Sequence, residues 1–133
     1  MSYLLDTNAM SDLMKRPDGR VRDHIEALMP DRLLTSVIVV AELRYGIQKV
    51  RSERLARLLD GVLQYMTVAV LTEDVAEHYA LVRDALERGG TPIGQNDLLI
   101  AAHALALDVV LVTDNEKEFS RVPNLRIENW LRG

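Results

Sequence analysis

Hydrophobic residues along the chain form two kinds of run, short apolar stretches and longer stretches with helical spacing. The short stretches predict buried strands at 3–5, 33–35, 66–71 and 109–112, with a last edge strand at 125–127. Apolar residues spaced by three or four positions predict helices after Asp6, after the turn at 17–19, after Ser36, near Leu55, after Thr72 and from Asp97 to Leu107. We expect Thr7 or Asn8 to cap the first helix and Ser36 to cap the third.

Strands that alternate with helices predict right-handed crossovers and a mostly parallel sheet. The expected fold class is therefore α/β, a single-domain three-layer sandwich with helices on both sides of a central sheet. A chain of 133 residues, 48% hydrophobic and 27% charged, has the size and composition of one globular domain, so we expect one domain over 1–133.

The absence of cysteine excludes a disulfide framework, a thiolate zinc site and a cysteine nucleophile. It suits a reducing cytoplasm, where we expect the protein to act. No stretch approaches the ~18 consecutive apolar residues that a membrane span needs, so we expect neither a signal peptide nor a membrane anchor.

The overall charge argues against binding to nucleic acid by charge alone, because 16 basic residues face 20 acidic ones and the net charge is −4. Aromatic residues make up only 5% of the chain, too few for a base-stacking platform. Between positions 42 and 57, however, five basic residues face two acidic ones. These either border an RNA cleft, with Arg44, Lys49 and Arg51 as the candidate contacts, or form the solvated face of two helices.

Polar side chains follow two of the predicted strands. Asp6 comes directly after the first strand, and Asp114 and Asn115 follow the strand at 109–112. Because the carboxyl ends of parallel strands share one edge of the sheet, we expect Asp6 and Asn115 to lie close together there.

Two further carboxylates lie among apolar neighbours on their helices. Asp97 is followed at helical spacing by Ile100 and Ala101, and Glu42 lies beside Leu43. Carboxylates that share a pocket repel one another by about 3 kcal/mol per pair at ~5 Å for an effective dielectric of ~20, so a positive group must offset them. Oxygen ligands without cysteine or paired histidines favour Mg²⁺ or Mn²⁺ over zinc or copper.

Each of these residues also has a simpler structural interpretation. Asp6 and Asp114 can be turn or cap residues, and Asp97 can complement the dipole of its helix. Glu42 can pair with Arg44 or Lys49, although neither has the favourable helical offset. The three histidines have no ligand spacing, and we interpret them as structural or surface residues. The joint pattern favours one site, because four independent coincidences at one sheet edge are less probable than a single pocket.

Four segments and one phenylalanine carry a resemblance to a known family. They are Leu4 to Asn8, Ala41 to Gly46, Gly94 to Ala104, Leu111 to Asn115, and Phe119. In this order and spacing the chain resembles the PIN-domain ribonucleases, specifically the VapC-type toxins of toxin–antitoxin pairs. The family's three acids correspond to Asp6, Glu42 and Asp97. Its fourth position corresponds to Asn115, where many relatives have aspartate.

The resemblance implies metal-assisted hydrolysis of RNA. Asp6, Asp97 and Asn115 would hold the metal ion, and Glu42 would bind it or orient the attacking water. The expected supporting residues are Thr7, Asn8, Ser36, Thr113 and Asp114. The resemblance also implies a homodimer and a small VapB-like antitoxin as partner.

Three other classes remain as alternatives. A receiver-like phosphoacceptor domain would need a lysine after a late strand, where this chain has Asp114. A haloacid-dehalogenase-like phosphatase would need a second aspartate where Asn8 stands. A noncatalytic PIN-like module that only binds protein would have lost some of its acids, whereas three are retained here.

Overall fold

The structure, a computed structural model, describes residues 1–132 and confirms the predicted alternation of strands and helices. The strands are β1 (Ser2–Leu5), β2 (Arg32–Ser36), β3 (Thr67–Ala69), β4 (Val110–Val112) and β5 (Ile127–Glu128). The helices are α1 (Thr7–Lys15), α2 (Arg20–Leu28), α3 (Val37–Val50), α4 (Glu53–Leu63), α5 (Glu73–Arg88), α6 (Gln95–Leu107) and the short α7 (Glu116–Phe119).

The five strands form one sheet in the order β3-β2-β1-β4-β5, and every neighbouring pair is parallel. The central strand β1 is buried on both faces, which explains its continuous run of apolar residues. In the register, Leu5 lies opposite Thr35 on one side and Val112 on the other. The residues that follow β1, β2 and β4 therefore meet at one edge of the sheet.

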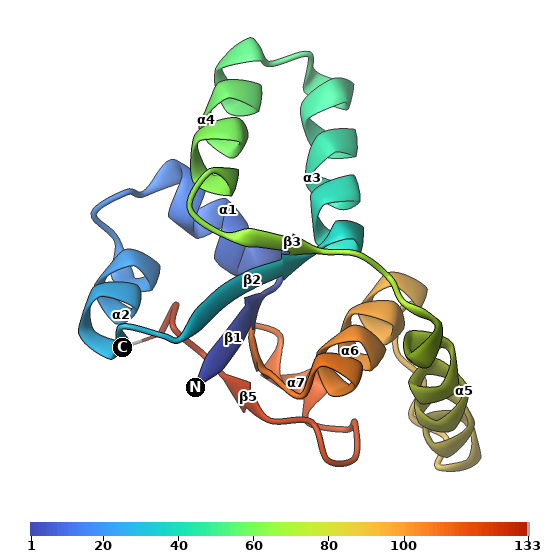
Figure 1. Ribbon diagram of the computed structural model, residues 1–133. Helices are drawn as coiled ribbons and strands as arrows, with labels where there is room; N and C mark the ends of the chain where they lie inside the picture. Colours follow the sequence, from blue (N-terminus) through green and yellow to red (C-terminus); the bar gives the residue numbers. More distant parts are fainter. Residues whose placement is uncertain (133) are drawn as a thin grey trace.

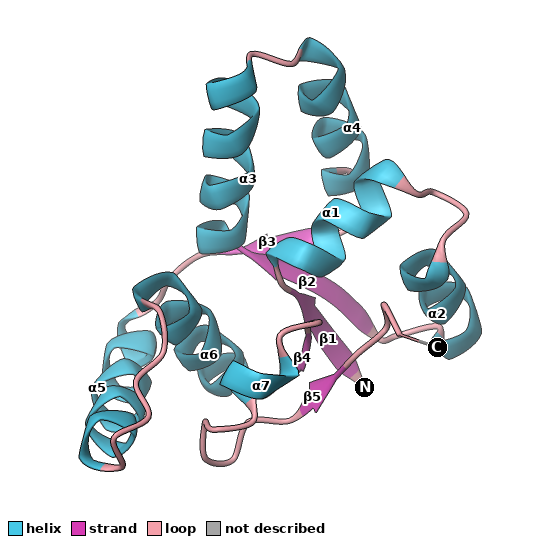
Figure 2. Ribbon diagram, turned by 180° about the vertical axis from the view of Figure 1, so that it is seen from behind, coloured by secondary structure: helices cyan, strands magenta, loops and turns pink. Residues whose placement is uncertain are grey.

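The helices surround the sheet as the predicted sandwich requires. Figures 1 and 2 show α1, α2 and α4 on one side of the sheet and the α5–α6 pair on the other. Helices α3 and α4 form a long pair that projects beyond the sheet at the top of Figure 1. No helix in the described part of the chain is both long and apolar enough to cross a membrane.

The core lies between these layers and continues to the end of the described chain. Trp130 is 1% exposed and packs between the ring of Tyr3, with centroids 4.9 Å apart, and the ring of His24, with which it is stacked at 5.6 Å. The C-terminal segment is thus fixed to the start of β1 and to α2 by aromatic packing.

Several predicted boundaries were wrong in detail. Asp6, not Thr7 or Asn8, caps α1, because its carboxylate accepts a hydrogen bond from the Ala9 amide. Helix α6 begins two residues before Asp97, at Gln95, and Gly94, with φ −58° and ψ 151°, is its N-cap. The last strand lies at 127–128, since only these residues pair with β4. Ser36 caps α3 as predicted, by accepting from the Ile38 amide.

Candidate active site at the carboxyl edge of the sheet

Asp6 lies at the centre of this edge and is almost fully enclosed, with 4% of its surface exposed. Its amide donates to the carbonyl of Val112, which fixes it beside the end of β4. The Asp6 carboxylate accepts hydrogen bonds from the Thr113 hydroxyl and from the backbone amides of Asn8 and Ala9. Burial nevertheless raises the pKa of Asp6, because these bonds only partly replace the lost water. A buried carboxylate of this kind favours a cationic ligand.

Glu42 reaches the same region from the first half of α3. Thr7, the first residue of α1, donates from its hydroxyl to Glu42 Oε1 at 2.9 Å. Because Thr7 directly follows Asp6, this bond ties Glu42 to the start of α1. Glu42 is half-buried and its contact is with Thr7, not with the Arg44 or Lys49 that the simpler interpretation required.

Asp97 comes from the first turn of α6 and faces a second carboxyl group. Burial and a hydrogen bond with Glu118 raise the pKa of Asp97 to about 7, and the negative charges of Glu42 and Asp6 add to the effect. Glu118 is the partner that keeps its charge, because the hydrogen bonds from Asp97 and Asn115 lower its pKa. At neutral pH the two carboxyl groups thus tend to share one proton.

Asn115 and Glu118 belong to the loop after β4 and to α7. The Asn115 amide donates to Thr113 Oγ1 at 2.9 Å, and its side-chain Nδ2 donates to Glu118. Glu118 also accepts from the amide of Gly94 at 3.3 Å, which joins α7 to the start of α6. Sequence reasoning missed Glu118, because the four-residue helix that carries it has no hydrophobic period. Its spacing of three from Asn115 was the only signal.

Asp114 is directed away from this pocket. Its carboxylate Oδ1 accepts from Asn129 Nδ2 at 3.0 Å and from Arg132 Nε at 2.9 Å. These two groups lower the pKa of Asp114. Its negative charge still raises the pKa of Asp6, so its influence on the pocket is through charge and not through contact.

Ser36 contacts a buried histidine on α6. The two ring nitrogens of His103 lie 2.8 Å from Ser36 Oγ and 3.1 Å from the carbonyl oxygen of Val70. Because a carbonyl can only accept, Nε2 carries the hydrogen and Nδ1 accepts from the Ser36 hydroxyl. Burial lowers the pKa of His103, in keeping with a neutral ring. His103 therefore has the structural position predicted for it, linking the helix of Asp97 to the start of the helix of Glu42.

The three predicted RNA contacts lie along α3 and beyond it. Arg44 forms an ion pair with Asp60 at 2.7 Å, which links α3 to α4. Lys49 and Arg51 follow Glu42 by seven and nine residues, about 10 Å or more along the helix at ~1.5 Å per residue. The structure does not bring these two to the carboxylates, and their contact with RNA stays a prediction.

The groups that could bind a metal ion here are all oxygen donors. They are the carboxylates of Asp6, Glu42, Asp97 and Glu118 and the side-chain oxygen of Asn115. Within residues 1–132, no three acidic, histidine or cysteine side chains are already arranged closely enough to hold a metal ion. Burial raises the pKa of both Asp6 and Asp97, and the negative charges of neighbouring carboxylates add to it, so a cation at this edge would be stabilised. Oxygen donors and excess negative charge fit Mg²⁺ or Mn²⁺.

The chain is similar to known proteins over nearly its whole length. The PIN domain family matches residues 3–125. Over 133 residues the chain is 41% identical to ribonuclease VapC2 of Rickettsia felis, covering 98% of both chains. It is 38% identical over 136 residues to ribonuclease VapC1 of Haemophilus influenzae, covering 99% of this chain and all of the other. It is 34% identical to the tRNA(fMet)-specific endonuclease VapC of Salmonella typhimurium, covering 98% of both.

Solved structures show the same likeness. VapBC2 from Rickettsia felis, crystallised with a DNA fragment from its promoter, contains a chain with a TM-score of 0.90 and 37% identity, covering 98% of this chain and 99% of that one. VapBC-5 of the VapBC toxin–antitoxin family, from Mycobacterium tuberculosis, gives a TM-score of 0.69 and 29% identity, with 96% of both chains covered. The chain therefore belongs to the PIN domain family, and its full-length relatives are ribonucleases of the VapC group.

Proposed function

We propose that this protein is the toxin of a toxin–antitoxin pair and that it cuts RNA with the carboxylates at the edge of the sheet. The observation that carries the proposal is that acids from four separate elements act on one another at this edge. The negative charges of Glu118, Glu42 and Asp6 all raise the pKa of Asp97, and Thr7, next to Asp6, holds Glu42 at 2.9 Å. Relatives named as ribonucleases and as a tRNA endonuclease support hydrolysis of an RNA phosphodiester.

The residues that would hold a divalent ion are Asp6, Asp97 and Asn115, with Glu118 as a further acid. When bound, Mg²⁺ or Mn²⁺ supplies a water of lowered pKa and positive charge beside the phosphate. Glu42, fixed by Thr7, is placed to accept a proton from an attacking water or to orient it. Thr113 and the backbone of Asn8 hold the Asp6 carboxylate in position through hydrogen bonds.

Incubation of the purified protein with total RNA tests this proposal. We expect cleavage with Mg²⁺, its loss in EDTA and its return when Mg²⁺ is restored. A parallel preparation of Asp6→Asn controls for contaminating nucleases, because these would cut equally in both. Cleavage that persists in EDTA, or wild-type protein that never exceeds the variant, would contradict the proposal and favour a noncatalytic protein-binding module.

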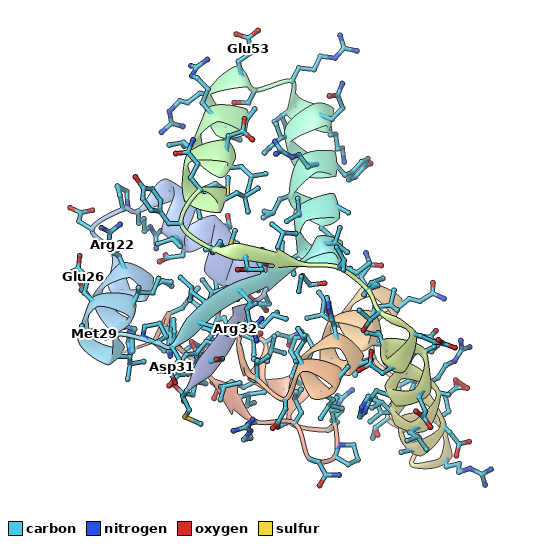
Figure 3. The ribbon with its side chains drawn as sticks, viewed as in Figure 1. Arg22, Glu26, Met29, Asp31, Arg32 and Glu53 are labelled. Carbon is cyan, nitrogen blue, oxygen red and sulfur yellow. The ribbon has the colours of Figure 1, made fainter. Side chains whose placement is uncertain are left out.

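A long groove between α1, α2 and α4 supports the antitoxin as partner. It has a volume of about 710 Å³, and its floor includes Leu13, Met14, Ile25, Leu58 and Val62. Four basic side chains and one acidic side chain border it: Lys15, Arg22, Arg54, Arg57 and Glu26. Arg22 and Glu26 both come from α2 (Figure 3) and form an ion pair with each other at 3.1 Å. We propose that an amphipathic antitoxin segment with acidic flanks occupies this groove.

Gly61 offers a direct test of the groove. It lines the groove on α4, and a Cβ atom added there would meet nothing within 4 Å. Gly61→Leu should therefore fold normally, keep RNA cleavage and weaken antitoxin binding at least ~10-fold. Gly46→Leu is the matched control, because Gly46 is equally open but lies on α3 outside the groove. Equal antitoxin affinity in both variants would rule this groove out.

The homodimer that the family resemblance implies, and the cytoplasmic location expected from the lack of cysteine, stay predictions. Sedimentation of the protein alone and with its antitoxin would test the first. Fractionation of cells that produce the protein would test the second.

A further inference from the structure

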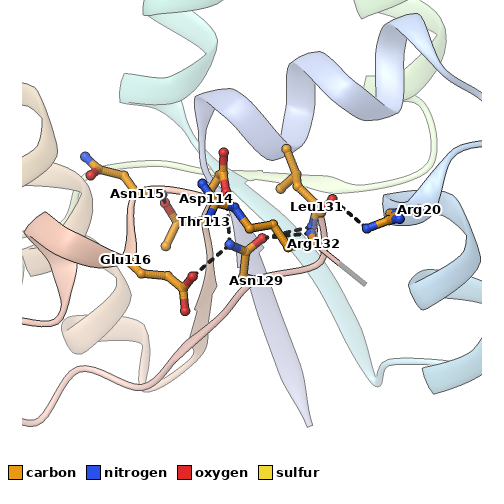
Figure 4. Close-up of polar contacts among 8 residues, drawn as sticks. All are labelled: Arg20, Thr113, Asp114, Asn115, Glu116, Asn129, Leu131 and Arg132. Carbon is orange, nitrogen blue, oxygen red and sulfur yellow. Dashed lines mark hydrogen bonds and ion pairs between the residues drawn. The ribbon is translucent and has the colours of Figure 1, made fainter.

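The C-terminal segment, through Asn129 and Arg132, forms hydrogen bonds with the loop that carries Asn115. Asn129 uses both hydrogens of its Nδ2 group, one toward Asp114 Oδ1 and one toward Glu116 Oε2, each at 3.0 Å. These two acceptors are the immediate neighbours of Asn115 in the sequence. A single amide group therefore brackets Asn115 from both sides, as Figure 4 shows.

Further contacts hold the Asn129 side chain in place. The Asn129 side-chain oxygen accepts from the backbone amides of Leu131 and Arg132, which folds the end of the chain around this side chain. Trp130 is buried beside it. Arg132 adds a charged bond from its Nε to Asp114 Oδ1. Asn129 is thus held next to a buried residue, whereas the Arg132 side chain is 74% exposed and adds a surface ion pair.

The hydrogen bonds of Asn129 and Arg132 also turn the side chain of Asp114 away from that of Asn115, at the end of β4. In Figure 4 the side chain of Asn115 points away from the group formed by Asp114, Asn129 and Arg132. The Asn115 backbone, with φ −89° and ψ 59°, is neither helical nor extended. Its carbonyl accepts from the Phe119 amide at 3.2 Å and its amide donates to Thr113 Oγ1, and the side-chain contacts on both flanks add to these two bonds.

We propose that Asn129 is a positioning residue for the active site, with Arg132 as its auxiliary. By bridging Asp114 and Glu116, Asn129 holds the loop so that Asn115 and Glu118 face Asp97. Residues 129 and 132 lie beyond the segment that the PIN domain family matches, which ends at residue 125. The inference rests on the proposed function for its catalytic consequence, but the bracketing of Asn115 is independent of it.

Asn129→Asp is the most selective variant. It keeps the shape and the oxygen that accepts from residues 131 and 132, but it replaces the bridging donor by a carboxylate facing two others. Arg126→Ala is the matched control, because Arg126 lies in the same segment and binds Asp108 through two 3.0 Å contacts at the opposite end of β4. Both variants lose polar contacts of the C-terminal segment, and only the first loosens the loop.

For Asn129→Asp we expect kcat for RNA cleavage to fall about 10- to 100-fold, with an unchanged KM for RNA and a higher Mg²⁺ concentration at half-maximal rate. Arg126→Ala should keep wild-type kinetics. If Asn129→Asp does not fold, Arg132→Ala takes its place, with a smaller fall in kcat that Arg132→Lys restores. Wild-type kcat and Mg²⁺ dependence in a folded Asn129→Asp, or in Arg132→Ala when it stands in, would overturn the proposal.

Amide hydrogen exchange separates this inference from the proposed function. In Asn129→Asp, exchange of the Asn115 and Phe119 amides should speed up at least ~10-fold while the amides of the sheet stay protected. If the wild-type protein cuts no RNA, the proposed function fails and exchange alone decides. Protection of these two amides equal to that in Arg126→Ala would then overturn the role of Asn129.

Discussion

The carboxyl group of Asp97 shares a hydrogen bond with the carboxylate of Glu118, across the gap between the first turn of α6 and α7. Two carboxyl groups at hydrogen-bond distance repel each other when both are ionised. One of them must therefore keep its proton, or a cation must bind between them. The protonation of the Asp97–Glu118 pair therefore depends on whether a cation is bound in the pocket.

Without metal, the free energy of unfolding should depend on pH through Asp97. Its pKa is about 7 in the folded protein against an ordinary value of 3.8, so the folded state binds the proton more tightly. The stabilisation is fully present below pH ~4 and is lost as the pH rises through about 7. Between pH ~4 and about 7, the free energy of unfolding in urea should fall by about 1–2 kcal/mol more for wild type than for Asp97→Asn. This figure already allows for solvent screening of the half-exposed Asp97.

Saturating Mg²⁺ should reverse this trend, because the ion competes with the proton for the same oxygens. Parallel pH dependence in wild type and Asp97→Asn would show that Asp97 does not retain its proton as described.

Glu118→Gln should lower RNA cleavage about 10- to 100-fold, because it removes one negative oxygen from the pocket and alters the hydrogen bond to Asp97. Glu53→Gln is the matched control. Glu53 lies in the first turn of α4, at the far tip of the α3–α4 pair (Figure 3). Initial rates on one RNA substrate would measure both. If the two variants lose activity equally, Glu118 has no special role.

Asp6→Asn should lower cleavage at least about 100-fold while the fold is kept. Asparagine can still cap α1, and loss of a buried charge relieves the desolvation that raises the pKa of Asp6. The melting temperature should therefore be equal to or above that of wild type. Asp12→Asn, on the same helix and with 9% of its side chain exposed, is the control and should keep activity. An active Asp6→Asn variant would remove Asp6 from the mechanism.

Ser36→Ala should destabilise the protein by about 1–3 kcal/mol, because it leaves the Ile38 amide and His103 Nδ1 without their shared partner. Cleavage by the folded fraction should change less than in Glu118→Gln, since Ser36 supports α3 and does not contact the carboxylates described here. Unfolding in urea and the cleavage rate, measured on the same preparation, distinguish these effects. A stability equal to that of wild type would mean that this hydrogen-bond chain contributes little.

The parts of the site that follow from periodicity and topology could be predicted from the sequence. Asp6 and Asn115 follow strands whose apolar runs are unmistakable, and a parallel sheet places such positions at one edge. Asp97 and Glu42 were identified because each lies on the apolar side of its helix.

Features fixed by tertiary contacts could not be predicted in the same way. Glu118 lies on a helix too short to show a period, and its role depends on Asp97 and Gly94, more than twenty positions earlier. The orientation of Asp114 depends on Asn129 and Arg132, whose proximity no local pattern reveals. Asp6 caps α1 and also belongs to the candidate site, so its interpretation as a helix cap does not exclude its interpretation as a site carboxylate.

The most direct test of the central claim is a crystal of the protein soaked in Mn²⁺ and measured at the manganese absorption edge. If Asp6 and Asp97 bind the divalent ion, an anomalous peak appears at the carboxyl edge of the sheet, bonded to oxygens of both residues, and no peak appears there in Asp6→Asn crystals. A wild-type crystal without such a peak, in which Asp97 remains bound to Glu118 at neutral pH, would contradict it.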